Sequence, residues 1–292
     1  MISKQKVEQE LEQLQGLTTL VETYETIAGA SVRRIRGSVL ANRAFHVGLN
    51  RMYHEITIAH QKEAKGVMAK KKNTNLHIDT LFTKPAKQTV LMLLSANTGL
   101  YGDVIGRIFI AFITEIKRTQ ADIMIIGRMG KMFFEEAMPG KEFTYFDFPD
   151  NAVSMQNLKE ISTFLLSYEK VIAFYAIFKN LLTQQVRASI VSGNALPAGK
   201  IEDASSPQSY RFEPSLEEVT LFFEKEIFAS LLEQVFQESR LAKLASRMVL
   251  LDRAMINIEN ELTRVILQKY RLRHRAINRQ LLDSLSGSAL WG

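Results

Sequence analysis

The sequence contains no cysteine, which excludes a disulfide framework and any metal site built on thiolates. It also lacks an uninterrupted apolar run approaching the roughly 20 residues that cross a bilayer. The N-terminal segment has neither the apolar block of a signal peptide nor the acid-poor composition of a transit peptide. We therefore expect a soluble chain whose link to a membrane, if it has one, passes through partner proteins.

Proline is scarce, with 6 residues in 292, and it is missing before Pro85 and after Pro214. Both ends of the chain can therefore form long helices. In the N-terminal segment, positions separated alternately by four and three residues are mostly apolar: Val7, Leu11, Leu14, Thr18, Val21, Glu25, Ala28, Val32, Ile35, Val39, Asn42, His46, Leu49, Tyr53 and Ile56. In the C-terminal segment the same steps give Leu241, Leu244, Met248, Leu251, Met255, Ile258, Leu262, Val265, Lys269, Leu272 and Ala276. Each series predicts the apolar seam of a long helix that packs along a partner.

The C-terminal helix would begin behind the N-cap Ser215 and, with no glycine before Gly287, would be on the order of 100 Å long. Since only the N-terminal segment has the same period, we expect the two ends to pair as an antiparallel coiled coil. Local bends are expected at the N-terminal glycines, Gly16, Gly29, Gly37 and Gly48. Separate amphipathic helices within a helical bundle are the alternative.

Between residues 88 and 192 the period changes to that of an inserted, Rossmann-like α/β domain. Apolar runs that predict strands lie at Thr89 to Leu94, Ile123 to Ile126, Phe143 to Phe148, Val171 to Phe178 and Val186 to Val191. Helix-like stretches between them lie at Val104 to Lys117, Met129 to Glu136 and Asn157 to Tyr168. This alternation predicts a mostly parallel sheet covered on both faces, and the last two runs are close enough to form an antiparallel hairpin. Residues 193–214 form a connecting loop.

The turn after the first strand, Ser95 to Asp103, has the glycines of a nucleotide-binding loop but not its full pattern. Gly99 and Gly102 are present, whereas the Gly-Lys-Ser/Thr of a phosphate loop and the third glycine of a dinucleotide loop are missing. The 5 histidines do not follow the i, i+4 spacing of a helical metal site. We therefore predict a structural turn, with neither a catalytic residue nor a cofactor or metal site.

The formal net charge is +6 and the isoelectric point is near 9.4, which predicts attraction to an acidic partner. Basic side chains crowd the end of the C-terminal helix: Arg264, Lys269, Arg271, Arg273, His274, Arg275 and Arg279. A merely solvated helix face and a coiled-coil scaffold or nucleic-acid-binding tail are both alternatives to a protein-binding collar. Tyr270 is the only aromatic residue near enough to stack on bases, which disfavours nucleic acid.

Several stretches are similar to the gamma subunit family of F-type ATP synthases. ASRMVLLDRAMINIENEL resembles the family pattern (A/S)-x-R-M-x-A-M-x-x-A-x-x-N, and NRQLLDSLSGSAL resembles its ending. LLSANTGLYGD resembles S-x-x-G-L-C-G, with Gly99, Leu100 and Gly102 matching, and IIGRMGKMFF resembles I-G-x-K-G-x-x-F-F. The first helix departs most, since TLVETYETIAGAS lacks the family's lysines and methionines. His274 and Asn278 replace the usual Gln and Thr, whereas Arg247 and Arg273 are retained.

The resemblance implies a non-catalytic rotor shaft that carries torque between a membrane ring and a catalytic hexamer. Its partners would be the alpha and beta subunits, the epsilon subunit and the membrane rotor c-ring, at the cytoplasmic face of a bacterial inner membrane. The expected segments are a shaft helix at 1–65, the inserted α/β domain at 66–213 and a second shaft helix at 214–292. The residues expected to contact the hexamer are Arg247, Arg273, His274, Arg275, Asn278, Leu20 and Ile27. The apolar tip, Leu285 to Trp291, would turn in a bearing.

Overall fold

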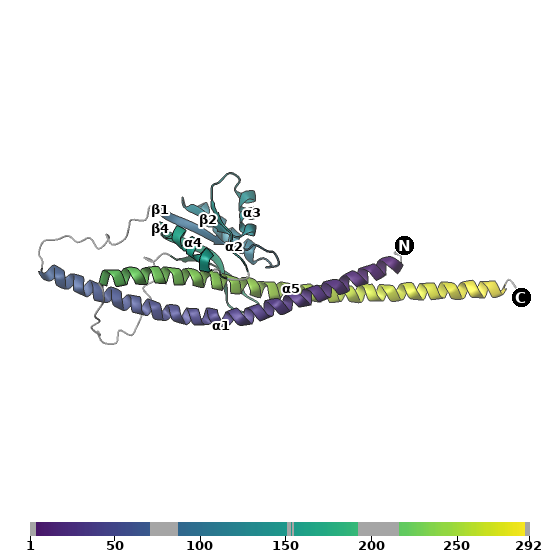
Figure 1. Cartoon of the computed structure of the whole chain (residues 1–292). Coiled ribbons are helices and arrows are strands. Elements are labelled where there is room, and N and C mark those ends of the chain that lie inside the picture. Colours follow the sequence, from purple (N-terminus) through teal and green to yellow (C-terminus); the bar gives the residue numbers. More distant parts are fainter. Residues whose placement is uncertain (1–3, 71–86, 151–152, 154, 192–215, 290–292) are drawn as a thin grey trace. The chain divides into compact units, whose positions relative to one another are not determined.

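Two long helices form the ends of the chain in the computed structural model, which describes residues 4–70, 87–150, 153, 155–191 and 216–289. Helix α1 spans Lys4–Lys70 and helix α5 spans Leu216–Ala289 (Figure 1). The expected connecting loop at 193–214 and the expected N-cap Ser215 lie outside the described residues. None of the helices in the described ranges combines the length and apolar character that crossing a membrane requires.

The seam predicted from steps of three and four residues is the buried side of both helices. On α1, every position of the series from Val7 to Asn42 is buried or half-buried, whereas the side chains of its last four members are not described. On α5 the series is buried or half-buried throughout except at Lys269 and Ala276. This burial confirms the seams. Because each seam runs along one unbroken helix, the alternative of separate helices in a bundle is not supported.

The chain divides into two compact units, Met1–Ser31 with Arg247–Gly292 and Val32–Ser246. In the first unit the helices approach closely, because a Cβ added to Gly29 would lie 3.7 Å from Met248 Cε. This unit joins the first part of α1 to the last part of α5, so the two helices run antiparallel within it. The division of the sequence into segments 1–65, 66–213 and 214–292 stays a prediction.

The second unit contains a five-stranded sheet, with β1 at Lys87–Leu94, β2 at Asp122–Ile126, β3 at Thr144–Phe146, β4 at Tyr168–Phe178 and β5 at Gln184–Ile190. The strand order is β3-β2-β1-β4-β5. Neighbouring strands are parallel except for β5, which pairs antiparallel with β4. Between β4 and β5, the Asn180 Oδ1 accepts the N–H groups of Leu182 and Thr183 and tightens the hairpin turn. The predicted parallel sheet with an antiparallel hairpin is confirmed.

Both faces of the sheet are buried, because side chains alternate between the faces along each strand. On one face, Leu91 and Leu93 pack with helices α2, Val104–Ile116, and α3, Arg128–Ala137. On the other face, Val90 and Met92 pack with helix α4, Met155–Leu165, and with apolar residues of α5. The residues that α5 contributes there are Phe228, Leu232, Val235 and Phe236. We call residues 87–191 the α/β lobe. Helix α5 lies outside this range, but its side chains form part of the lobe's apolar core.

Two predicted elements have wrong boundaries, one helix and one strand. The helix expected from Asn157 to Tyr168 ends at Leu165, because the Ser167 hydroxyl donates to the Phe164 carbonyl at 2.7 Å and closes the last turn. Tyr168 instead begins β4, where its hydroxyl bonds to Asp122 Oδ2 at 2.8 Å. The strand expected from Phe143 to Phe148 is limited to Thr144–Phe146, the part that pairs with β2.

Gly127 joins β2 to α3. Two features favour glycine at this position, its backbone conformation and the closeness of Ala96. Its φ is 98°, a conformation that side chains with a Cβ rarely adopt. An added Cβ would also lie 2.8 Å from the Ala96 backbone nitrogen, which cannot move without shifting the end of β1. Glycine at this position therefore permits the close approach of β2 to the turn after β1.

We predict that Gly127→Ala lowers the free energy of unfolding by about 3 kcal/mol, from strain and the clash with Ala96. The matched control is Gly106→Ala inside α2, where an added Cβ meets nothing within 4 Å. Alanine there should raise the free energy by about 0.5 to 1 kcal/mol, because glycine disfavours a helix. Urea unfolding of the full chain measures both. Equal midpoints for the two variants would contradict this account of Gly127.

Candidate functional site

The strand order reverses at β1, which has β2 on one side and β4 on the other. In open α/β sheets, ligands bind outside the carboxyl ends of the strands at such a switch point. The turn after β1, beginning at Ser95, occupies this position, and the structure confirms it as a strand-to-helix turn. Whether this crevice can bind a ligand therefore depends on what lies against Ser95.

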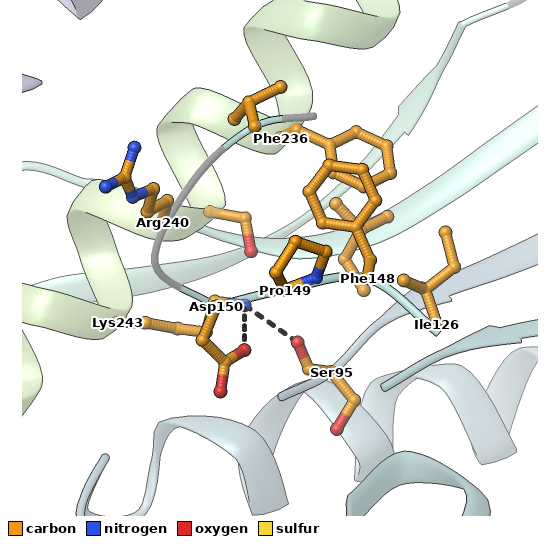
Figure 2. A pocket seen from close by; sticks show the side chains of 11 residues that line it. Ser95, Ile126, Phe148, Pro149, Asp150, Phe236, Arg240 and Lys243 are labelled. Atoms are coloured by element: carbon orange, nitrogen blue, oxygen red, sulfur yellow. Dashed lines mark hydrogen bonds and ion pairs between the residues drawn. The ribbon is translucent and has the colours of Figure 1, made fainter. Parts of the chain in front are cut away.

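Lys243 of α5 occupies the crevice. Its Nζ donates a hydrogen bond to the Ser95 carbonyl at 2.8 Å and lies 3.7 Å from Asp150 Oδ1 (Figure 2). The side chains of Lys243 and Asp150 are 11% and 7% exposed, so the ion pair is almost fully removed from solvent. A buried cation of this kind needs both an acceptor and a counter-charge, and the crevice supplies each of them.

Asp150 also holds the turn. Its carboxylate accepts the backbone N–H of Asn97 at 3.0 Å and that of Thr98 at 2.9 Å, as well as the Thr98 hydroxyl at 2.9 Å. Charge-assisted bonds from successive N–H groups fix the path of the backbone away from β1. Asp150 thus connects the turn after β1 to Lys243 of α5.

The second half of the turn contacts α5 one helical turn further on. Leu100 and Gly102 have φ values of 66° and 59°, which turn the chain sharply. The Ser246 hydroxyl donates to the Tyr101 carbonyl at 2.7 Å. A Cβ added to Gly102 would lie 3.2 Å from Ser246 Oγ, so glycine allows this close contact. The motif Gly99, Leu100 and Gly102 thus lies in a turn that contacts a helix of its own chain.

The remaining space in the crevice is small. A cavity of about 20 Å³ is bordered by Phe148, Phe236 and Arg240, among others (Figure 2). The rings of Phe148 and Phe236 lie 4.4 Å apart between their centroids, and burial lowers the pKa of Arg240. Pockets that bind small molecules have volumes of several hundred Å³. The crevice beside Lys243 therefore has little free volume.

The residues predicted to contact partners all lie in the first unit, Met1–Ser31 with Arg247–Gly292. On α1, Leu20 and Ile27 are 50% and 57% exposed. On α5, the predicted set of Arg273, His274, Arg275 and Asn278 is exposed. Arg247 differs, because it is half-buried and interacts within the chain. Their role in binding partners stays a prediction.

Exposed apolar side chains also lie beside the buried seam of each helix, and the sequence predicted only three of those named here, Leu20, Ile27 and Leu285. On α1 this exposed stripe comprises Leu17, Leu20, Tyr24 and Ile27. On α5 the exposed stripe comprises Ile256, Leu267, Tyr270, Ile277, Leu281 and Leu285. On α1 these positions follow the three-and-four steps of the seam with a different starting residue, whereas on α5 polar residues such as Asn260, Thr263 and His274 interrupt the series. Exposed apolar side chains gathered along a helix are typical of a protein-binding surface.

Basic side chains flank the stripe on α5. No Asp or Glu occurs in the sequence between Glu261 and Asp283, whereas the basic residues from Arg264 to Arg279 are all exposed. Arg264 pairs with Glu261 at 2.8 Å, which neutralises one of them. A partner for this surface would combine apolar side chains with acidic groups.

Comparison with known proteins gives a match along nearly the whole chain. The profile of a family described as ATP synthase matches residues 3–290. An ATP synthase gamma chain of Desulforudis audaxviator is 23% identical over 92% of each chain. A second gamma chain, from a Geobacter species, is also 23% identical and is covered over 98% of its length, with 99% of this chain.

A solved structure has the same fold. It comes from the central stalk and c-ring of the Tetrahymena thermophila mitochondrial ATP synthase, with a TM-score of 0.54 and 18% identity. The similarity covers 80% of this chain and 99% of that chain. At this identity the likeness establishes the arrangement of helices and sheet.

The buried seam and the exposed stripe predict different effects of mutation. Val265→Ala in the seam, where Val265 is 0% exposed, should lower the free energy of unfolding by about 2 kcal/mol because it leaves a cavity. Leu267→Ala, two residues further on and 52% exposed, should change it by about 0.5 kcal/mol or less. Urea unfolding followed by circular dichroism tests both, and a larger loss at Leu267 would contradict this assignment.

Proposed function

Because this chain belongs to the gamma-chain family of ATP synthases, we propose that it is the central shaft of a rotary F-type ATP synthase. In this role it transmits torque between an ion-driven ring in the membrane and a catalytic hexamer of alpha and beta subunits. The observation that carries the proposal is a family match over residues 3–290, which covers the paired end helices and the inserted lobe together.

The exposed stripes on α1 and α5 are suited to contact the alpha and beta subunits. They combine apolar side chains such as Leu20 and Ile27 with the basic series around Arg273 and Arg275. Burial of apolar area holds partners together, and the basic residues attract acidic segments. The α/β lobe is then left for the epsilon subunit and the rotor c-ring, and the apolar side chain of Leu285 lies near the tip that turns in the hexamer.

The proposed subunit is not itself catalytic. The crevice at the switch point of the sheet is occupied by Lys243, and the turn beside it lacks the lysine of a phosphate loop. A nucleotide-dependent enzyme built on this lobe is therefore disfavoured. ATP would be bound and converted in the alpha and beta subunits.

The proposed location is the cytoplasmic face of a bacterial inner membrane, where the shaft is held by its partners. The relatives named above include gamma chains of two bacteria, Desulforudis audaxviator and a Geobacter species. The alternative of a coiled-coil scaffold or nucleic-acid-associated protein is not favoured, because the family match extends over residues 3–290 and includes the basic end of α5.

Reconstitution tests the proposal directly. The chain is mixed with the alpha and beta subunits from the same genome, and the mixture is separated by size. We expect a complex with one copy of this chain for three alpha and three beta subunits. If the hexamer forms and this chain elutes alone at low salt, the shaft assignment is wrong.

We predict that the purified chain alone does not hydrolyse ATP, because its crevice is filled by Lys243. A coupled-enzyme assay measures ATP turnover, and the reconstituted complex serves as the positive control. Turnover that co-elutes with the pure chain and survives a second purification step would overturn the non-catalytic role.

Charge reversal tests the basic surface of α5. Arg273→Glu with Arg275→Glu should lower the number of ions, protons or sodium, pumped per ATP hydrolysed, because acidic groups of the hexamer would then be repelled. Both residues are exposed, so the fold should tolerate the change. The matched control is Lys117→Glu with Arg118→Glu, an equally exposed pair at the end of α2. If the two double variants pump equally well, the basic surface has no role in coupling.

A further inference from the structure

We propose that Lys243, Asp150 and Ser246 form a lock that fixes the α/β lobe to α5 against sliding and rotation, so that torque passes between them. This inference rests on the proposed function. The lobe is inserted between two long helices, so a force passing directly from α5 into the sheet must cross the noncovalent contacts that α5 makes with it. Those contacts include the apolar face around Phe236, Ala242 in the cluster on the opposite face of the sheet, and the polar contacts at the carboxyl edge.

Apolar contacts alone do not fix a helix in register, because burial of apolar surface has no preferred direction. Side chains such as Phe228 and Leu232 hold α5 on the sheet through their burial, and their close packing contributes to the register. Hydrogen bonds to charged groups depend on distance and angle, and they therefore specify one position. A buried polar contact between α5 and the lobe is the kind of interaction that would hold the register.

The Lys243 contact joins three parts of the fold. Its ammonium reaches the Ser95 carbonyl at the end of β1 and the Asp150 carboxylate in the segment after β3. Asp150 in turn holds the N–H groups of Asn97 and Thr98. A displacement of α5 along the sheet would break the bond to Ser95 and leave two buried charges apart, which is strongly unfavourable.

Ser246 adds a second point of attachment, three residues further along α5. Residues three apart lie on the same face of a helix, so Lys243 and Ser246 both face the lobe. The Ser246 hydroxyl bonds to the Tyr101 carbonyl at 2.7 Å and is buried. Two bonds separated by one helical turn oppose rotation of α5 about its own axis as well as sliding. One bond alone would act as a pivot.

The first experiment measures the lock in the isolated full chain. The sequence contains no cysteine, so cysteines introduced at the exposed Glu136 in α3 and Ala229 in α5 are the only sites for spin labels. Pulsed dipolar spectroscopy then gives the distribution of distances between the lobe and α5. Lys243→Met should broaden the distribution about twofold or more, because the helix gains alternative positions.

Two further variants keep this measurement decisive. Lys243→Met with Asp150→Asn removes both charges, so it tests the lock even if the single variant fails to fold with an unpaired carboxylate. Lys159→Met removes an exposed lysine of α4 and should leave the distribution unchanged. If the distance distribution of the double variant is as narrow as that of the parent protein, Lys243 and Asp150 do not fix the lobe and the proposal is wrong.

The second experiment tests torque in the assembled complex. Lys243→Met with Asp150→Asn should retain ATP hydrolysis but lower ion pumping per ATP about threefold or more, because the lobe slips on a turning helix. Gly102→Cys with Ser246→Cys is then added as a rescue. A Cβ added at position 102 would lie 3.2 Å from Ser246 Oγ, close enough for a disulfide. Because the φ of Gly102 is 59°, a cysteine there is strained, and the reduced form of the same variant is the control for that strain. Pumping should return on oxidation and be lost again on reduction.

Comparing ion pumping by the same protein in its oxidised and reduced forms distinguishes loss of the lock from general loss of function caused by the substitutions. If pumping remains normal in the charge-free variant, or stays low although the disulfide has formed, the role in torque is overturned. Failure of the proposed function gives a different result. In that case the chain would not join the alpha and beta subunits, while the label distances would still decide whether Lys243 and Asp150 hold the lobe on α5.

Discussion

Burial of one apolar seam on each long helix is the interaction on which the rest of the structure depends. A helix of 74 residues such as α5 cannot bury its seam by itself, and no nearby segment has the same period. The covering residues come from the other end of the chain, as the contact of Gly29 with Met248 shows. The segment between the two end helices is consequently an insertion. All five strands of the sheet belong to this segment.

The elements were predictable where one local pattern dominates. Apolar runs such as the one ending at Leu94 identified the strands, and steps of three and four identified the seams through Val265. Predictions failed where a short contact decides the outcome. Tyr168 follows directly on the apolar pattern of α4 in the sequence. It nevertheless belongs to β4, where its hydroxyl bonds to Asp122, 46 residues earlier in the chain. Such a partner cannot be read from the local period.

The candidate site was predictable only in part, for a related reason. The sequence separates apolar from polar positions, but it does not separate an apolar stripe that is covered from one that is exposed. Leu251 and Leu267 follow the same type of stepping, yet one is 3% exposed and the other 52%. Lys243 presents the opposite case, since a lysine on a helix usually faces solvent. Its burial depends on Asp150 and Ser95, which are distant in sequence.

The participation of α5 in the α/β core has a consequence for how the protein is made. Phe228 and Phe236 belong to the same apolar cluster as Val90 of β1, although they are synthesised long after it. On the ribosome, the sheet is therefore complete before the helix that covers one of its faces has emerged. During this interval the nascent lobe presents an uncovered apolar surface, and Asp150 lacks its ion pair with Lys243. An apolar surface of this kind favours aggregation until α5 covers it.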